Sequence, residues 1–218
     1  MVWIVSICVE LIFEKGNEVR FLSHLDVARA MERAVRRAKL PVAYSRGYNP
    51  RPKLAFASPL PLGVCGSAER AALALSRPMA AREVFAALAP CMPPGLRLKD
   101  VVALPNGRKP AYHLLDRADY VVSFPAPLDP PLGQRVAELL ARPTLPVARR
   151  KGQGWKTVDI RRYIISARAT SDTELELTLA CGPGGHASPI EVLRALEAYS
   201  DDQPMPRIVR TRLYRRAG

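Results

Sequence analysis

Two short stretches of this chain combine cationic side chains with aromatic rings, a pairing suited to holding a nucleic acid. In residues 44–53, Arg46, Arg51 and Lys53 stand among Tyr44 and Tyr48. Basic groups bind a phosphate backbone, and aromatic rings stack on unpaired bases. The segment therefore predicts a contact surface for RNA. The alternative is a surface loop that its prolines stiffen and whose tyrosines pack inward.

The second stretch is residues 149–156, which read Arg-Arg-Lys-Gly-Gln-Gly-Trp-Lys. Its two glycines predict a hairpin tip, its four cations supply charge, and Trp155 offers a stacking plane. The alternative is a solvated hairpin with Trp155 folded back onto the sheet. Together with the helix before the first stretch, the candidate nucleic-acid-binding residues are Arg33, Arg36, Arg37, Arg46, Tyr48, Arg51, Lys53, Arg149, Arg150, Lys151, Trp155 and Lys156.

A glycine-rich run at residues 182–185 leads through Ser188 and Pro189 into a helix. A helix start of this kind can bind an anion through free backbone N–H groups, which makes Gly184, Gly185 and Ser188 candidates. The run lacks the GxxxxGK[ST] pattern, so a nucleoside triphosphatase is not supported. The alternative is a plain strand-to-helix turn.

Catalysis would fall to His24, at the start of the first helix. A metal-independent ribonuclease could use such a histidine as a general base, with Tyr44 or Tyr48 beside it. A histidine at a helix start more often makes a structural hydrogen bond, and the balance favours a protein that is not an enzyme. The four cysteines lie far apart without metal-ligand spacing, so no metal and no cofactor is predicted.

The elements that must position these residues fall into two similar halves. In the first, we expect a strand at 3–13, a helix at 23–38, strands at 42–45, 53–57 and 68–75, a helix at 80–89 and a strand at 96–104. In the second, we expect strands at 118–124, 145–148, 157–160, 162–169, 173–180 and 206–214, with helices at 129–141 and 188–199. The order predicts an α+β fold of two tandem ferredoxin-like (β-α-β-β-α-β) domains with antiparallel sheets, the second with an extra hairpin. Their expected bounds are 1–104 and 118–218, joined by a linker at 105–117.

Charge is concentrated rather than spread. The 218 residues carry a formal net charge of +13, with 33 Lys and Arg against 20 Asp and Glu. Residues 20–53, 149–168 and 207–216 are net +7, +6 and +5, so the remainder is net acidic. A GC-rich genome would favour arginine over lysine, but it does not explain the net charge. Basic segments that a fold gathers on one face are typical of a phosphate binder.

Several motifs resemble one known family. They are Phe21-x-Ser23-His24-x-Asp26, Glu32-Arg33-Ala34-x-Arg36-Arg37-Ala38, Pro41 through Ser45 and Gly47 to Pro50-x-Pro52, Leu60-Pro61-Leu62-Gly63, Val158-Asp159-Ile160-Arg161, and Gly182-Pro183-Gly184-Gly185 through Ser188-Pro189. The chain resembles the radical-SAM-linked protein family, a bacterial domain of unknown function usually found after or encoded beside a radical S-adenosylmethionine module. The resemblance implies a separately encoded radical SAM protein as a partner. The chain has no cluster-binding cysteine motif, so it cannot itself be that enzyme.

The sequence thus predicts a cytoplasmic, RNA-binding accessory protein that presents RNA to a radical SAM partner. Its apolar N-terminal run meets Glu10 and Glu14 too early to span a membrane. One alternative is a metal-independent endoribonuclease or RNA-modifying enzyme; the tandem arrangement resembles that of CRISPR repeat-processing endoribonucleases. Another is a protein–protein adaptor, with Trp155 and Tyr48 as interface anchors. The sequence leaves the oligomeric state open.

Overall fold

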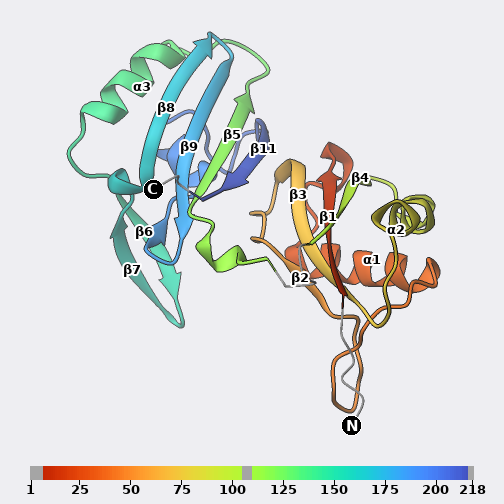
Figure 1. Cartoon of the computed structure of the whole chain (residues 1–218). Helices are drawn as coiled ribbons and strands as arrows, with labels where there is room; N and C mark the ends of the chain where they lie inside the picture. Colours follow the sequence, from red (N-terminus) through yellow and green to blue (C-terminus); the bar gives the residue numbers. More distant parts are fainter. Residues whose placement is uncertain (1–6, 105–109, 216–218) are drawn as a thin grey trace. The chain divides into compact units, whose positions relative to one another are not determined.

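The chain divides into two compact units, Met1–Tyr112 and His113–Gly218 (Figure 1). A computed structural model describes residues 7–104 and 110–215. Residues 3–6 of the expected first strand, residues 105–109 of the expected linker and Arg216 of the third basic segment lie outside the described residues.

In unit 1, two helices pack against an antiparallel sheet (Figure 1). The strands are β1 (Ile7–Lys15), β2 (Leu54–Phe56), β3 (Val64–Leu75) and β4 (Leu96–Ala103), in the order β2-β3-β1-β4. The helices are α1 (His24–Arg37) and α2 (Ala81–Leu88). Alternate residues of β1, namely Val9, Leu11 and Phe13, face the buried sides of both helices and form the core with β3 and β4.

Helix α1 begins and ends where its sequence indicates. The Oγ of Ser23 accepts a hydrogen bond from the backbone N–H of Asp26 (3.2 Å), which caps the first turn. The helix buries Val27, Met31 and Val35 at helical spacing. Lys39 follows with a left-handed φ of 51°, and Pro41 prevents continuation.

Unit 2 contains a larger set of strands. They are β5 (Arg117–Ser123), β6 (Pro146–Lys151), β7 (Gly154–Asp159), β8 (Ile164–Ser171), β9 (Glu174–Gly182), β10 (Gly185–His186) and β11 (Arg207–Tyr214), with helices α3 (Leu132–Ala141) and α4 (Pro189–Ala195). The sheet order is β10-β9-β5-β11, and β8 also pairs with β9. Strands β6 and β7 form a separate two-stranded sheet. Every pairing described within the unit is antiparallel.

The predicted fold class, two tandem ferredoxin-like domains, is wrong. Two copies of β-α-β-β-α-β contain about eight strands. The described residues contain eleven strands and four α-helices. In unit 2, β9 pairs with β5, β8 and β10, and β6 and β7 form a sheet of their own, which differs from the single four-stranded sheet of a ferredoxin-like domain. The order of elements expected for the first half is found, but that order does not specify which strands bond to one another. The hydrogen-bonded pairing of strands determines the sheet, and the sequence pattern carries no information about that pairing.

Smaller corrections concern short elements. The strand expected at residues 42–45 is reduced to isolated bridges, Val42 with Leu75 and Tyr44 with Pro52. The helix expected at 188–199 ends at Ala195, and β10 had no sequence signal. Among the described residues, no helix is long and apolar enough to cross a membrane.

Candidate nucleic-acid interface

Residues 44–53 form an ordered protrusion of unit 1 between α1 and β2. Backbone hydrogen bonds from Ser45 N to Arg51 O (2.8 Å) and from Lys53 N to Ala43 O (2.8 Å) join the two arms. The Oγ of Ser45 also accepts a bond from the N–H of Arg51 (3.0 Å). These contacts close the base of the loop and leave residues 46–50 at its tip. The loop is therefore a braced arm rather than a slack connector.

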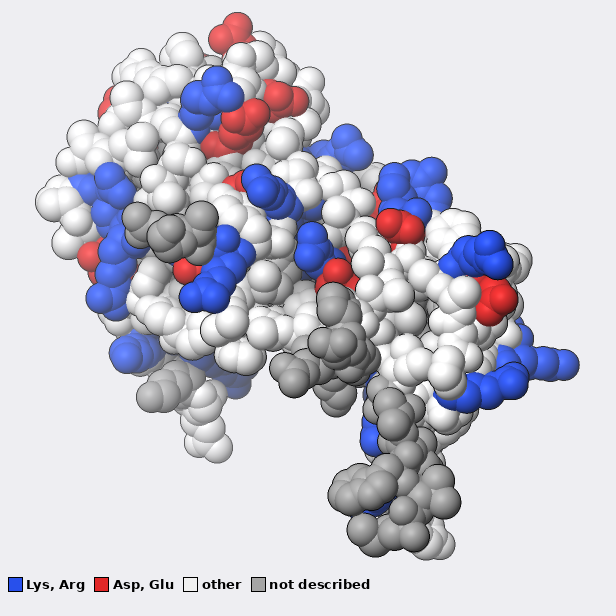
Figure 2. Space-filling view, viewed as in Figure 1, with Lys and Arg blue, Asp and Glu red and all other residues white. Residues whose placement is uncertain are grey.

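The cationic and aromatic side chains of this arm are exposed to solvent. Tyr48 is fully exposed and Tyr44 is 45% exposed, so Tyr48 does not pack inward. Arg46, Arg51 and Lys53 are exposed, and within the described part of the chain their side chains make no hydrogen bond or ion pair. Figure 2 shows Lys and Arg side chains on the visible face of both units, many with Asp or Glu beside them. Cations without such neighbours are the ones available to an external anion.

The arginines of α1 divide into two kinds. Arg33 and Arg36 are exposed and make no described side-chain contact. Arg37 donates a hydrogen bond to the carbonyl oxygen of Cys91 (2.6 Å), in the 3-10 helix η2 (Ala89–Cys91). Arg37 therefore ties α1 to the chain after α2, which accounts for its presence without any ligand.

In unit 2, strands β6 and β7 form a hairpin whose two faces differ. Its turn holds Gly152 at a φ of +61°, as tight two-residue hairpin turns require. One face carries the half-buried side chains of Val147, Arg149 and Val158, and the other carries exposed side chains except for the half-buried Asp159 at its base. Side chains alternate along a strand, so this difference defines an inner and an outer face.

Trp155 lies on the outer face, directly across from Arg150. It is 75% exposed and is not folded back onto a sheet. Arg150 is exposed as well, and Lys156 is exposed across from Arg149 on the inner face; neither forms a described ion pair. For Lys151, only the backbone lies among the described residues.

Arg149 points to the inner face and is held by Glu191 in two hydrogen bonds, Nε to Oε1 (2.6 Å) and a terminal nitrogen to Oε2 (2.7 Å). A further bond reaches the carbonyl oxygen of His186 (2.8 Å). Burial alone would raise the pKa of Glu191, but the Arg149 guanidinium and the Ser188 N–H outweigh it and lower that pKa. The guanidinium of Arg149 is thus committed to the fold, unlike that of Arg150.

The expected anion site at the start of α4 is already served by a carboxylate. Ser188 and Glu191 form a capping box, in which the Ser188 N–H donates to Glu191 Oε2 (2.8 Å) and the Ile190 N–H donates to Ser188 Oγ (3.3 Å). An external anion at Ser188 would have to displace Glu191. Gly184 and Gly185 lie away from the helix start, in the β9–β10 turn.

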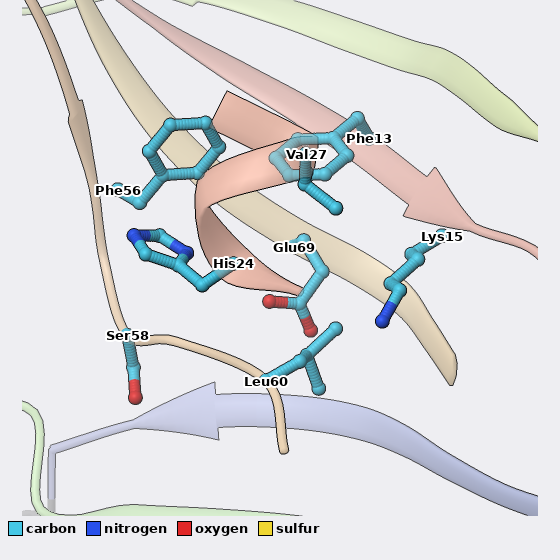
Figure 3. Close-up of a pocket in the computed structure, with 8 residues that line it drawn as sticks. All are labelled: Phe13, Lys15, His24, Val27, Phe56, Ser58, Leu60 and Glu69. Atoms are coloured by element: carbon cyan, nitrogen blue, oxygen red, sulfur yellow. The ribbon is translucent and has the colours of Figure 1, made fainter. Parts of the chain in front are cut away.

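His24 lines a small pocket of about 20 Å³ in unit 1 (Figure 3). Its ring meets the Phe56 ring edge-to-face, with 5.1 Å between centroids. The buried side chains of Lys15 and Glu69 line the same pocket, and Lys15 Nζ donates to the carbonyl oxygens of Arg20 (2.8 Å) and Leu22 (3.0 Å). Neither Tyr44 nor Tyr48 is among the residues that line it. The pocket has the packing of a structural site, and it does not bring the three candidate catalytic residues together.

A model of the bacterial family described as "Uncharacterized protein conserved in bacteria (DUF2344)" matches residues 9–189. The chain belongs to this family. The matched range includes α1, the loop at residues 44–53, the β6–β7 hairpin and the β9–β10 turn. A search of curated proteins found no match. The family description names no activity, and the link to a radical SAM protein stays a prediction.

Sequence reasoning missed one group of residues in unit 2. Arg117, Arg162 and Tyr163 line a pocket beside the β9–β10 turn. The adjacent pair Arg162-Tyr163 could have signalled it, since the same pairing of cation and ring marked the other two stretches. Arg117 gave no signal, because only strand pairing brings it to Ala180 at the end of β9.

Proposed function

We propose that the protein is a cytoplasmic RNA-binding accessory protein, with the outer face of the β6–β7 hairpin as its main contact and residues 44–53 as a second one. The observation that carries this proposal is the exposure of Trp155 beside the unpaired Arg150. Large aromatic side chains usually bury most of their surface, because their burial stabilises a fold. An indole left in solvent on a hairpin contributes little to stability, whereas it provides a plane on which a base can stack.

The surrounding charges suit the same ligand. Arg150 shares the outer face with Trp155, and Lys156 is exposed on the inner face of the same hairpin; both can contact phosphates without breaking any described ion pair of the fold. Unpaired bases stack on aromatic rings, while the bases of a duplex are already stacked on each other. The proposal is therefore specific for single-stranded RNA or for loops of structured RNA.

The test is a titration of a labelled single-stranded RNA, followed by fluorescence anisotropy. Trp155→Ala should weaken binding by about 1–3 kcal/mol, since that is the typical worth of one stacked base. Trp155→Phe should retain most of the affinity, because it keeps a ring. Phe21→Ala is the matched control: Phe21 is 59% exposed but lies outside both proposed contacts. Equal affinities for wild type and Trp155→Ala would refute the proposal.

The second contact is tested with arginine pairs. Arg46→Ala with Arg51→Ala should weaken RNA binding more than Arg77→Ala with Arg82→Ala. All four side chains are exposed, but only the first pair lies on the arm of unit 1. Equal losses for the two pairs would show that net charge alone is responsible and would remove the arm from the interface.

A finer proposal rests on the family resemblance alone: a separately encoded radical SAM protein acts on the bound RNA. It is tested by adding that protein to the RNA complex and measuring RNA modification by mass spectrometry. Modification that needs this protein and is lost in Trp155→Ala would support it. Modification that proceeds equally without this protein would contradict it.

A further inference from the structure

Unit 2 contains an open pocket of about 470 Å³ beside the β9–β10 turn. Its size falls within the range of small-molecule sites. It is formed where the end of β9, the start of β5 and the 3-10 helix η5 (Arg161–Tyr163) meet. The lining residues that matter for its chemistry are Arg117, Arg162, Tyr163, Gly184, Leu114 and Ile165.

The glycines around the turn differ in how tightly neighbouring atoms and backbone conformation constrain them. A Cβ on Gly185 would lie 2.2 Å from the Tyr163 ring, and the φ of Gly185 is +121°. A Cβ on Gly182 would lie 3.0 Å from Asp116. Gly184 has no such constraint: a Cβ there would meet nothing within 4 Å, and its φ lies outside the left-handed region. Packing therefore explains why residues 182 and 185 are glycines, but it does not explain Gly184. Because Gly184 has no side chain, its backbone is open to the pocket.

The pocket carries more positive than negative charge. Arg162 stacks on Tyr163, with 4.8 Å from its guanidinium carbon to the ring centroid, and makes no described hydrogen bond or ion pair. Stacking uses the flat face of the guanidinium and leaves the N–H donors at its edge available. Arg117 uses one terminal nitrogen on the carbonyl oxygen of Asp116 (3.0 Å), and the same nitrogen lies 3.7 Å from the Asp116 carboxylate. Asp116 offsets part of the Arg117 charge, and Asp159 interacts electrostatically with Arg162 without a described ion pair.

Apolar surface completes the lining. Leu114 is 41% exposed and Ile165 is 47% exposed, both unusually open for aliphatic side chains. A ligand that matches this lining has an anionic group for the guanidinium groups and an apolar ring for Leu114 and Ile165.

We propose that this pocket binds a nucleoside monophosphate, either free or as the 5′-terminal nucleotide of an RNA strand. Arg162 and Arg117 hold the phosphate, the open backbone at Gly184 lets it approach, and Leu114 and Ile165 contact the nucleoside. The site goes beyond the RNA contact of the hairpin and does not depend on it.

The experiment is isothermal titration calorimetry on the full chain with 5′-AMP, adenosine and inorganic phosphate as separate probes. A second arm compares short oligoadenylates that carry a 5′-phosphate or a 5′-hydroxyl. Arg162→Gln should weaken binding of the phosphorylated probe by roughly tenfold or more, because hydrogen bonds between charged groups are lost. Gly184→Val should also weaken binding of the phosphorylated probe, because its side chain would occupy the space through which the phosphate approaches the backbone.

Each variant has a matched control in unit 2. Arg142→Gln removes an exposed arginine whose side chain makes no described contact. Gly133→Ala adds a Cβ that also meets nothing within 4 Å, but in α3. Both controls should bind the probes like the wild type, and circular dichroism should show all four variants folded.

The outcomes separate the two sources of the nucleotide. Binding of 5′-AMP but not adenosine, lost in Arg162→Gln, supports a free nucleotide. A 5′-phosphate preference confined to the oligonucleotides, and lost in the same variant, supports a strand end. The proposal is overturned if the phosphate makes no difference in either arm, if inorganic phosphate binds as well as 5′-AMP, or if the variants match their controls. Trp155→Ala with the 5′-hydroxyl oligonucleotide reports on the hairpin separately, so either proposal can fail alone.

Discussion

Two adjacent arginines have different roles in this protein. Arg149 and Arg150 are adjacent in sequence, and composition treats them alike. The hairpin turns Arg149 inward to Glu191 and Arg150 outward beside Trp155. Sequence reasoning could identify both as cations, but only the strand register and the position of Glu191 separate a structural arginine from an available one.

This division predicts different costs of removal. Arg149→Ala should lower the free energy of unfolding by about 1.5–3 kcal/mol, the range for hydrogen bonds to charged groups. The side chains of Arg149 and Glu191 are only 21% and 18% exposed, so water cannot fully replace the lost donors. Arg150→Ala should change stability by less than about 0.5 kcal/mol, as for most surface positions. Urea unfolding monitored by circular dichroism measures both, and equal costs would contradict the assignment.

The same pair predicts an acid dependence. The pKa of Glu191 is lowered from an ordinary value of 4.5 in the folded protein, so its contribution to stability is fully present above about pH 4.5. The contribution is lost as pH falls through the lowered folded value. Wild type should therefore exceed Glu191→Gln in unfolding free energy by most at neutral pH, and the difference should shrink below about pH 4.5. The difference between wild type and Glu191→Gln is used because the pKa values of Glu14, Asp26 and Asp159 are lowered too. Those carboxylates make the stability of both proteins depend on pH, and the difference removes their contribution. A pH-independent difference would contradict the prediction.

At the scale of elements, prediction succeeded where a periodic pattern was long. The helix expected at residues 23–38 is α1, His24–Arg37, because an apolar stripe and a capping serine agree on it. Strand β10 has only two residues, Gly185 and His186, too few for any alternation to appear. Residues 42–45 do not form the expected strand, because only isolated bridges join them to Leu75 and Pro52.

The β9–β10 turn offers a sharp comparison of two adjacent glycines. Gly185→Ala should destabilise the protein by more than about 1 kcal/mol, since alanine is strained at positive φ and its Cβ would overlap the Tyr163 ring. Gly184→Ala should change the unfolding free energy by less than about 0.5 kcal/mol, because its Cβ has room. Thermal or urea unfolding distinguishes the two. Comparable losses would mean that the turn is not held against Tyr163.

At the scale of the whole molecule, element order was a poor guide to fold class. The chain separates into two units, and its strands do not reduce to two plain β-α-β-β-α-β repeats. The hairpin expected around residues 149–156 is β6–β7, but its attachment to β10 and α4 depends on the contacts of Arg149. Such contacts link residues far apart in sequence, and no local pattern encodes them. The candidate interface stays a prediction: the sequence identifies its cations and rings, and the structure adds that Trp155 and Arg150 are exposed.

The net charge of +13 predicts that RNA binding weakens as the salt concentration rises. For single strands, the logarithm of the binding constant falls with the logarithm of salt concentration by about 0.7 per phosphate contact. Arg150→Gln with Lys156→Gln should therefore reduce the slope by up to about 1.4, whereas Trp155→Ala should lower affinity at an unchanged slope. Arg77→Gln with Arg82→Gln is the charge-matched control and should leave the slope unchanged. A slope that responds equally to both pairs would argue against a localised interface.

One carboxylate joins three segments of unit 2. Glu191 receives the guanidinium of Arg149 from the hairpin and the amide of Ser188 at the start of α4, while Arg149 also reaches His186 in β10. Opening the hairpin therefore loosens the bond that protects the Ser188 amide. A ligand that immobilises Trp155 should slow hydrogen–deuterium exchange at Ser188, a residue it never touches, and Arg149→Ala should abolish that effect. The first turn of α4 would then act as a reporter, recording occupancy of an exposed arm in the exchange rate of an amide inside the unit.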